Sequence, residues 1–433
     1  MKLLTTICSV GIMAVFGLSG CASSAYFYDQ VGAQEKANEV NIYVDHLGNI
    51  YPNTGVSEGA PPRRKNSVSV RRHISSEFCD DPLKGSDVSH ACDAKDDSAW
   101  RAFQNELWRK KSEDIFLKAN SRSGIRPIVF LVHGFNNLPK QAKKSYDLAH
   151  QKVTEVASVG SDPFFVNIYW DGFFAKRSGL AALGIIDAWW KAQASGPLVG
   201  FNMRILLNAL DDNYSKHGIA EPPIRVITHS SGAFVIAATI GDTSTALKKM
   251  WAESPKEEYG FYKSHAKDMD GPYRVPDYED FRIAMYAAAT PSNTFTGKFC
   301  PKAKSLKSCK TTQDNLAKAH LTLPLGTLNP NVDILIAYNP NDIGPTKARL
   351  ISTKSSFGGA SGLGGDKDLI CDLINAQKAK VHPYDMVREE GENYTSHYFK
   401  DYLNQRKSKV FLKAFMSDGD IIRHDFAEKF CDD

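Results

Sequence analysis

Residues 226–234, VITHSSGAF, contain the side chains best suited to nucleophilic chemistry. An apolar run ends there at a hydroxyl-rich turn, and an apolar stretch of helical length, AFVIAATI, follows it. A serine held on a sharp strand-to-helix turn exposes its hydroxyl to a histidine that can take its proton. Because an S-x-G triplet is common, a nucleophilic role for Ser230 depends on partners elsewhere in the chain.

Three other polar groups follow apolar runs. The turn His133-Gly134-Phe135-Asn136 comes after residues 128–132, Asp342 comes after residues 332–339, and His397 comes ten residues after residues 381–387. Since the carboxyl ends of parallel strands meet at one edge of a sheet, we expect these groups to lie near Ser230.

Other acidic residues and histidines could take the place of Asp342 and His397 beside Ser230. Asp171 follows the apolar run at residues 164–170, and Asp333 stands at the beginning of its run. His382 lies within an apparent strand, and His424 lies near the C-terminus. Asp333 is thus at the wrong end of its run to reach the edge where Ser230 is expected.

The elements that must position these residues alternate between strands and helices. Apolar runs predict buried strands, and polar segments of helical length separate several of them. We therefore expect an α/β fold with a mostly parallel sheet and helices on both faces. In residues 38–52, Val40, Ile42 and Val44 alternate with polar residues before a turn at residues 46–49, and this pattern predicts an N-terminal β-hairpin. The expected strands are residues 128–132, 164–172, 224–230, 281–289, 332–339 and 381–387, and the clearest helices are residues 98–119, 139–158 and 180–216.

The order Ser…Asp…His on such a chain resembles the α/β-hydrolase fold. Residues 228–232, T-H-S-S-G, resemble its G-x-S-x-G nucleophile elbow, with Thr228 in place of the first small residue. The H-G-F-N turn resembles the oxyanion turn of a bacterial branch of this fold. The resemblance spans roughly residues 100–425.

The resemblance implies a role for each residue of the candidate site. Ser230 would be the nucleophile, His397 the general base and Asp342 the acid that orients the histidine. The backbone N–H groups of Phe135 and Ser231 would form the oxyanion hole, with His133 and Gly134 shaping the turn. His133 could instead be structural, with its ring bonded to a neighbouring loop.

In the first 21 residues, an apolar stretch follows Lys2 and ends in Leu18-Ser19-Gly20-Cys21, so residues 1–20 form the predicted signal. This ending resembles the bacterial lipoprotein signal, which implies that Cys21 is acylated and residues 21–38 form a tether. Ala22 after the cysteine favours the outer membrane as the location. An ordinary cleaved signal or an uncleaved anchor is the alternative. Residues 39–433 then form one domain, with a loop-rich excursion at residues 57–98.

Six of the eight cysteines lie beyond the signal region. An even number in an exported chain favours disulfides, whereas buried thiols are the alternative. Short loops favour Cys79–Cys92 and Cys300–Cys309, which leaves Cys371 with Cys431. No C-x-x-C spacing occurs, and we expect neither a metal nor a cofactor. A formal net charge of +4 gives no indication of a nucleic-acid partner.

Together these features predict a lipid-anchored, exported serine hydrolase that cleaves carboxylic esters, including lipid esters, through a Ser-His-Asp acyl-enzyme mechanism. Two alternatives remain open. One is a non-catalytic envelope lipoprotein that keeps the fold for binding or scaffolding, and the other is an acyltransferase, thioesterase or amide hydrolase using the same triad. The sequence leaves the acyl-chain length and the oligomeric state open.

Overall fold

The computed structural model describes about half of the chain. The described residues are 35–51, 70, 97–122, 124–157, 162–173, 182–241, 273–289, 331–342, 367, 370–371, 373–374, 381–387, 397–419, 421 and 430–431. The predicted signal with Cys21, His424, and the predicted pairs Cys79–Cys92 and Cys300–Cys309 lie outside these residues, as does the 57–98 excursion apart from Val70 and residues 97–98.

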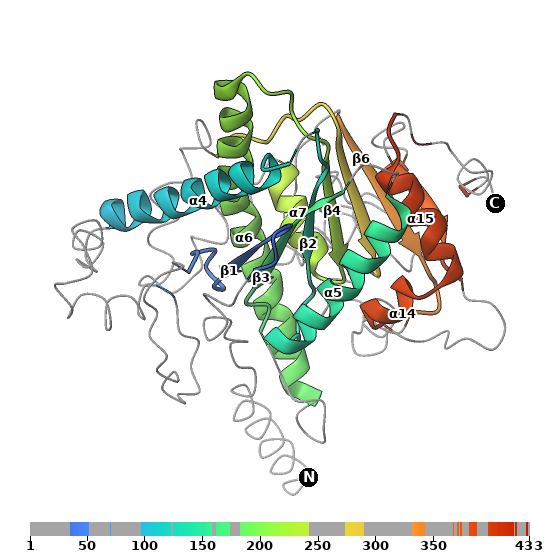
Figure 1. The fold of residues 1–433 in the computed structure, drawn as a ribbon. Coiled ribbons are helices and arrows are strands. Elements are labelled where there is room, and N and C mark those ends of the chain that lie inside the picture. The colour runs from blue at the N-terminus through green and yellow to red at the C-terminus, as the bar shows by residue number, and fades with distance from the viewer. Residues whose placement is uncertain are drawn as a thin grey trace, which may run out of the picture.

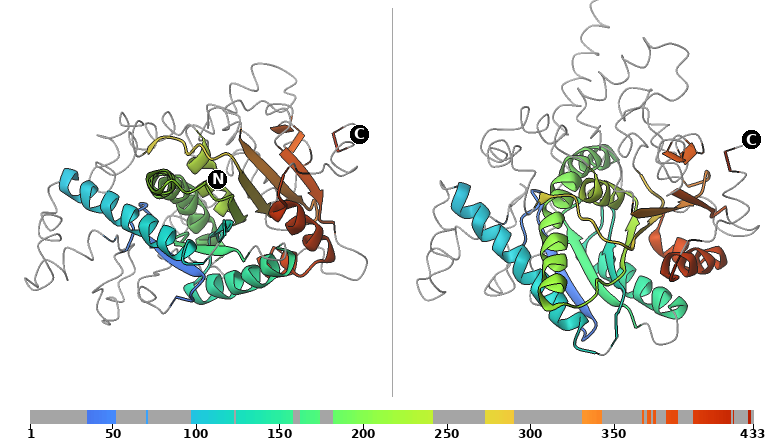
Figure 2. Two further views of the ribbon diagram at one scale, coloured as in Figure 1. Left: turned by 45° about the horizontal axis from the view of Figure 1, so that its top comes forward. Right: turned by 90° about the horizontal axis from the view of Figure 1, so that it is seen from above.

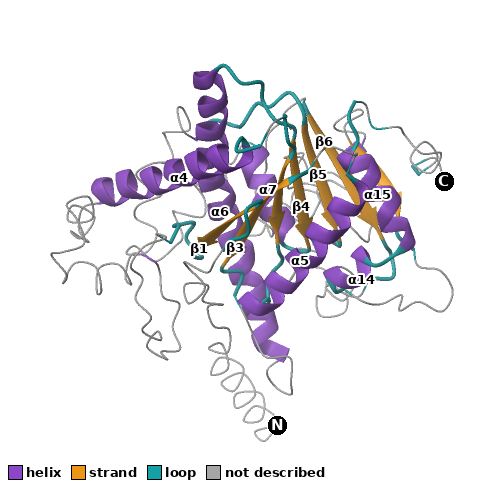
Figure 3. Cartoon of the chain, in the orientation of Figure 1, coloured by secondary structure: helices purple, strands orange, loops and turns teal. Residues whose placement is uncertain are grey.

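Seven parallel strands form a single sheet in the order β1-β3-β2-β4-β5-β6-β7 (Figures 1 and 3). The predicted α/β class with a parallel sheet is therefore confirmed. Each apolar run that predicted a strand forms one. The strands are β1 Glu39–Val44, β2 Ile128–Val132, β3 Phe164–Trp170, β4 Ile224–His229, β5 Phe281–Tyr286, β6 Val332–Tyr338 and β7 Val381–Asp385.

Helices cover both faces of the sheet. One layer holds α4 Asp97–Ala119, α6 Ala182–His217 and α7 Gly232–Ile240, and the other holds α5 Pro139–Val156, α14 Phe399–Leu403 and α15 Arg406–Met416 (Figure 2). Alternate strand residues enter separate cores, since Phe130 packs under the first layer and Val129 under the second. Burial on both faces explains the continuous apolar runs. Among the described helices, none has the length and apolar content needed to span a bilayer.

Two glycines of α6 let that helix pack closely on α7. A Cβ atom at Gly200 would lie 2.0 Å from the carbonyl oxygen of Val235, and one at Gly196 would lie 3.0 Å from Cβ of Phe234. Only glycine allows this approach of the two helices. Because α7 begins directly after Ser230 and Ser231, this contact fixes the helix that leaves the candidate site.

The predicted N-terminal hairpin is reduced to a tight turn. Its first strand, β1, pairs in parallel with β3, and a single antiparallel bridge joins Val44 to Ile50. All six residues of β1 are buried, so the alternation of polar and apolar residues does not reflect a solvent-exposed face. The polar positions are satisfied inside the protein, as where Asn167 Nδ2 donates to Asn41 Oδ1 over 2.9 Å. Buried polar groups paired in this way mimic the pattern of an amphipathic strand.

A disulfide joins Cys371 to Cys431, with Cα atoms 5.6 Å apart. Cys371 follows β6 in the chain, and Cys431 lies near the C-terminus. The bond therefore ties the chain end to the region between β6 and β7.

Candidate active site

The chain changes direction across the sheet between β2 and β4. From β2 it passes through α5 on one face to β3, and from β4 it passes through α7 on the other face to β5. The connections that leave the carboxyl ends of β2 and β4 thus diverge. Ligands of open α/β sheets bind in the crevice at such a point. Both the His133 turn and Ser230 border it.

Ser230 stands on a strained turn between β4 and α7. Its φ angle is +54°, a value that non-glycine residues adopt at a cost and that is concentrated at functional sites. The neighbouring strand holds it in place, because the Ser230 N–H donates to the Tyr286 carbonyl over 3.0 Å and the Ser230 carbonyl accepts from Ala289 N–H over 3.2 Å.

Two glycines let neighbouring backbone approach this turn. A Cβ atom at Gly134 would lie 2.8 Å from Cβ of Ser230, and one at Gly232 would lie 2.6 Å from the Val132 carbonyl oxygen. Both distances are too short for a side chain. The loop after β2 is therefore pressed directly against the serine turn.

Thr228 occupies the position where the hydrolase motif has its first small residue. It is fully buried, and it lies between Val132 and Met285 in the sheet register. Its hydroxyl oxygen has no hydrogen-bond partner among the described residues. The strand thus accommodates the bulk of threonine and leaves its polar atom unsatisfied.

His397 connects Ser230 to Asp342. Its Nε2 lies 2.8 Å from Ser230 Oγ, and its Nδ1 lies 2.8 Å from Asp342 Oδ1. With Nδ1–H donating to the carboxylate, Nε2 is the acceptor for the serine hydroxyl. Ser230 and Asp342 are buried, whereas the His397 side chain is 22% exposed. The structure therefore brings together the three residues predicted from sequence.

Tyr402 is an additional partner of the carboxylate. Its hydroxyl donates to Asp342 Oδ2, and it accepts a 3.4 Å hydrogen bond from Asn339 Nδ2. Tyr402 is fully buried on α14. No local pattern marks this residue, because only the docking of α14 brings it to the loop after β6.

His229 supports the backbone of His397. Its Nε2–H donates to the His397 carbonyl over 2.9 Å, and its ring stacks on Phe399 with centroids 5.2 Å apart. Burial and the nearby His397 lower the pKa of His229 to about 3. The ring is therefore neutral at pH 7. Its place beside Ser230 in the sequence is the one signal that could have revealed this role.

His133 orients the turn after β2. Its Nδ1–H donates to the Gly134 carbonyl over 2.7 Å, and its Nε2 accepts from Trp170 N–H over 3.3 Å. Burial lowers the pKa of His133 to about 4, so it keeps this neutral tautomer. Asn137 Nδ2 also donates to the Gly134 carbonyl, over 2.9 Å. The alternative of a structural His133 bonded to a neighbouring loop matches these contacts.

The N–H of Phe135 is directed by the same interactions. In a planar trans peptide the N–H points away from the carbonyl, so fixing the Gly134 carbonyl also fixes the Phe135 N–H. This N–H donates to Ser231 Oγ over 2.7 Å. Phe135 and Ser231, the two residues expected to supply oxyanion donors, therefore contact each other. The contact is made by the side chain of Ser231, for which the sequence predicted no role.

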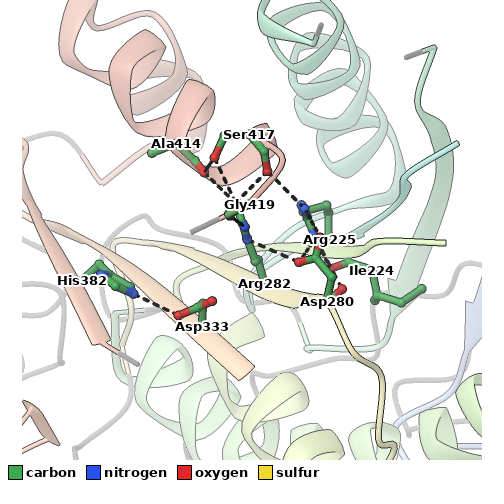
Figure 4. Close-up of polar contacts among 9 residues, drawn as sticks. All are labelled: Ile224, Arg225, Asp280, Arg282, Asp333, His382, Ala414, Ser417 and Gly419. Carbon is green, nitrogen blue, oxygen red and sulfur yellow. Dashed lines mark hydrogen bonds and ion pairs between the residues drawn. The ribbon is translucent and has the colours of Figure 1, made fainter. Parts of the chain in front are cut away.

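The competing acids and bases have other partners. Asp171 Oδ1 accepts from Phe173 N–H over 3.0 Å, and its Oδ2 lies 4.0 Å from His46 Nδ1. Asp333 and His382 pair with each other across 3.0 Å at the amino end of β6 and β7 (Figure 4). Asp171, Asp333 and His382 therefore do not belong to the Ser230 cluster.

The described residues contain no group of three or more His, Cys, Asp or Glu side chains able to hold a metal ion. No protein-family model, curated protein or solved structure is significantly similar to the chain.

Proposed function

We propose that the protein is a serine hydrolase of the α/β-hydrolase type that cleaves carboxylic esters through an acyl-enzyme on Ser230. The observation that carries the proposal is the line of contacts from Ser230 Oγ through His397 to Asp342, with 2.8 Å at each step. Nucleophile, base and orienting acid are the three groups that this chemistry requires.

The proton transfers of the mechanism use the groups of this line and water. Ser230 Oγ attacks the ester carbonyl carbon as its proton moves to His397 Nε2, which gives a tetrahedral oxyanion. His397 then protonates the departing alkoxide as the carbon–oxygen bond to it breaks. Water then attacks the acyl carbon as its proton moves to His397 Nε2. The bond from that carbon to Ser230 Oγ breaks as His397 returns the proton to Oγ, which releases the acid and restores the serine. Asp342 stabilises the imidazolium in both steps.

Backbone strain and burial also support catalysis over scaffolding. A residue at φ +54° costs free energy, and so does a fully buried carboxylate. A binding protein gains nothing from maintaining both next to a histidine. Non-catalytic scaffolding is therefore a secondary candidate. Acyl transfer and thioester or amide cleavage would use the same triad and are alternatives that the substrate series must separate.

The cellular location rests on residues 1–21 alone. We propose that Cys21 is acylated and that the domain lies at the cell envelope, with lipid esters among its substrates. A Cys21→Ser variant should move from the detergent phase to the aqueous phase in a detergent partition experiment. Equal partition of the two proteins would contradict the anchor.

Hydrolysis of p-nitrophenyl esters of increasing chain length tests the activity. The intact protein should hydrolyse part of this series, and Ser230→Ala should lose at least about 10³-fold in kcat. Ser112→Ala is the matched control, because Ser112 is also fully buried but lies on α4. Absence of hydrolysis by the folded intact protein would favour the scaffold, and thioester or amide analogues then test the remaining candidates.

A further inference from the structure

The hydroxyl of Ser231 has one hydrogen bond and the capacity for another. Its oxygen accepts from the Phe135 N–H over 2.7 Å, which leaves its own hydrogen to donate. Ser231 is fully buried, and none of the described residues accepts that hydrogen. Because a buried donor without an acceptor is costly, such a group in a candidate active site indicates an acceptor that arrives with the substrate.

The Phe135 N–H is firmly directed at this hydroxyl. His133 Nδ1–H and Asn137 Nδ2 both donate to the Gly134 carbonyl of the same peptide. Turning the N–H toward another acceptor would break both bonds. The N–H of Phe135, which was expected to face the oxyanion, is therefore engaged by the Ser231 hydroxyl.

The hydroxyl lies beside the nucleophile. A Cβ atom at Gly134 would be 3.4 Å from Ser230 Oγ, so the peptide that carries the Phe135 N–H borders the attacking atom. Ser231 also follows Ser230 directly, on the side where its backbone N–H is expected to face the oxyanion.

We propose that the side-chain hydroxyl of Ser231 donates a hydrogen bond to the oxyanion of the tetrahedral intermediate, alongside the Ser231 backbone N–H. The Phe135 N–H then acts through the hydroxyl, since accepting a hydrogen bond makes an O–H a stronger donor. This role rests on the proposed hydrolase function and deepens it. Ser231 becomes a catalytic residue, and His133 becomes a positioning residue for the donor chain.

The opposite role for the hydroxyl predicts the opposite sign. If Ser231 Oγ merely occupied the Phe135 N–H in the resting enzyme, its removal would free that N–H and would raise kcat or leave it unchanged. If the hydroxyl donates, its removal should lower kcat by about 10²-fold, which is typical of one lost oxyanion donor.

Steady-state kinetics of Ser231→Ala on a p-nitrophenyl ester test this inference. We expect a fall in kcat of about 10²-fold with KM changed by less than about threefold, because the donor acts on the transition state. The inhibition constant of a trifluoromethyl ketone, which forms a tetrahedral adduct with a serine, should rise in parallel. A purely structural role would not make these two quantities change together.

Two further variants keep the inference open to contradiction. Ser231→Cys preserves the side-chain shape with a weaker hydrogen-bond donor, so its kcat should lie between those of the intact protein and Ser231→Ala. If Ser231→Ala does not fold, Ser231→Cys takes its place in the test. Ser112→Ala should match the intact protein. Unchanged or faster turnover of a folded Ser231 variant would overturn the inference. If the folded intact protein does not hydrolyse the ester at all, the hydrolase function on which the inference rests is overturned instead.

Discussion

Two aspartate–histidine pairs lie at opposite ends of the same region of the sheet. Asp342 and His397 meet across 2.8 Å beyond the carboxyl ends of β6 and β7. Asp333 and His382 meet across 3.0 Å near the amino ends of the same two strands. The residue types and distances are nearly the same, so the pair alone does not distinguish a catalytic site from a structural one.

The group that faces the second ring nitrogen of each histidine distinguishes the two ends of the sheet. At the carboxyl end, the free nitrogen of His397 faces Ser230 Oγ on a strained turn. At the amino end, Nδ1 of His382 is buried and has no partner within the described part of the chain. A serine hydroxyl completes the first pair, whereas no hydroxyl among the described residues completes the second.

Arginines dominate the amino end instead (Figure 4). Arg225 binds Asp280 through two 2.7 Å hydrogen bonds, and Arg282 donates to the carbonyls of Ala414 and Ser417 at the end of α15. Cations at a helix C-terminus are favourable because the last carbonyls lack partners within the helix. The amino end thus anchors α15, which follows the His397 segment, and we interpret it as the structural end.

The largest test of this contrast is one matched substitution at each end. Asp342→Asn should lower kcat for ester hydrolysis by about 10³–10⁴-fold, because an amide cannot hold the required histidine tautomer. Asp333→Asn should stay within about twofold of the intact protein, because it is remote from the reacting groups. Equal losses would remove the functional distinction between the two pairs.

A substitution in the arginine cluster should affect stability and leave the chemistry unchanged. Arg282→Met should lower the free energy of unfolding by about 3 kcal/mol, since it deprives partly buried helix-end carbonyls of a buried charged donor. Arg122→Met is the control, because it removes an exposed ion pair with Asp162 and should cost under about 1 kcal/mol. Urea unfolding measures both values. A loss of kcat in the folded Arg282 variant would contradict a purely structural role.

The pH dependence of stability should reveal the buried neutral histidine at the carboxyl end. The pKa of His229 falls to about 3 on folding, so below its ordinary pKa of 6.5 the unfolded chain binds a proton that the folded protein does not. The stabilisation that the neutral His229 ring contributes is fully present above its ordinary pKa of 6.5 and is lost as the pH falls toward its folded pKa of about 3. Between pH 7.5 and 5.5 the intact protein should lose about 1 kcal/mol more than His229→Gln, which keeps an N–H donor without titrating.

Glu221 acts in the opposite direction, because burial raises its pKa to about 7. Glu221 contributes equally to the pH dependence of the intact protein and of His229→Gln, so its effect cancels when the two unfolding free energies are subtracted. Parallel curves for the intact protein and His229→Gln would show that His229 is not held neutral by the fold.

The smallest expected effect concerns the departure from the hydrolase motif. Thr228→Val keeps the branched shape and removes a buried hydroxyl that has no partner among the described residues. The free energy of unfolding should rise by about 0.5–1 kcal/mol, with kcat nearly unchanged. A clear decrease in stability would show that the hydroxyl is paired in the folded protein.

Much of this arrangement could be predicted because strand ends are visible in the sequence. A buried parallel strand is a continuous apolar run, and the polar residue after it lies at the carboxyl edge of the sheet. Asp333 and Asp342 stand at opposite ends of one such run, so their order along it was enough to separate them. The same argument placed Ser230 and the His133 turn.

Contacts between distant elements could not be predicted in this way. Tyr402 reaches Asp342 only after α14 docks, and the bond from Phe135 N–H to Ser231 Oγ depends on a side-chain rotamer. The extent of the hairpin, which has a single antiparallel bridge, and the parallel pairing of its first strand with β3 were also not predictable, because a buried polar pair at Asn41 gives the same alternation as an exposed strand face. The spacing of polar residues along the sequence indicates which positions are polar, but it does not indicate which groups they hydrogen-bond to.

Reaction with a fluorophosphonate probe tests the central claim most directly, because the probe bonds to an activated serine as fluoride leaves. Mass spectrometry of the folded protein should find one adduct, located on Ser230, and none on Ser230→Ala. An adduct that persists in Ser230→Ala, or that forms equally fast in Asp342→Asn, would contradict the assignment of the carboxyl end as the catalytic one.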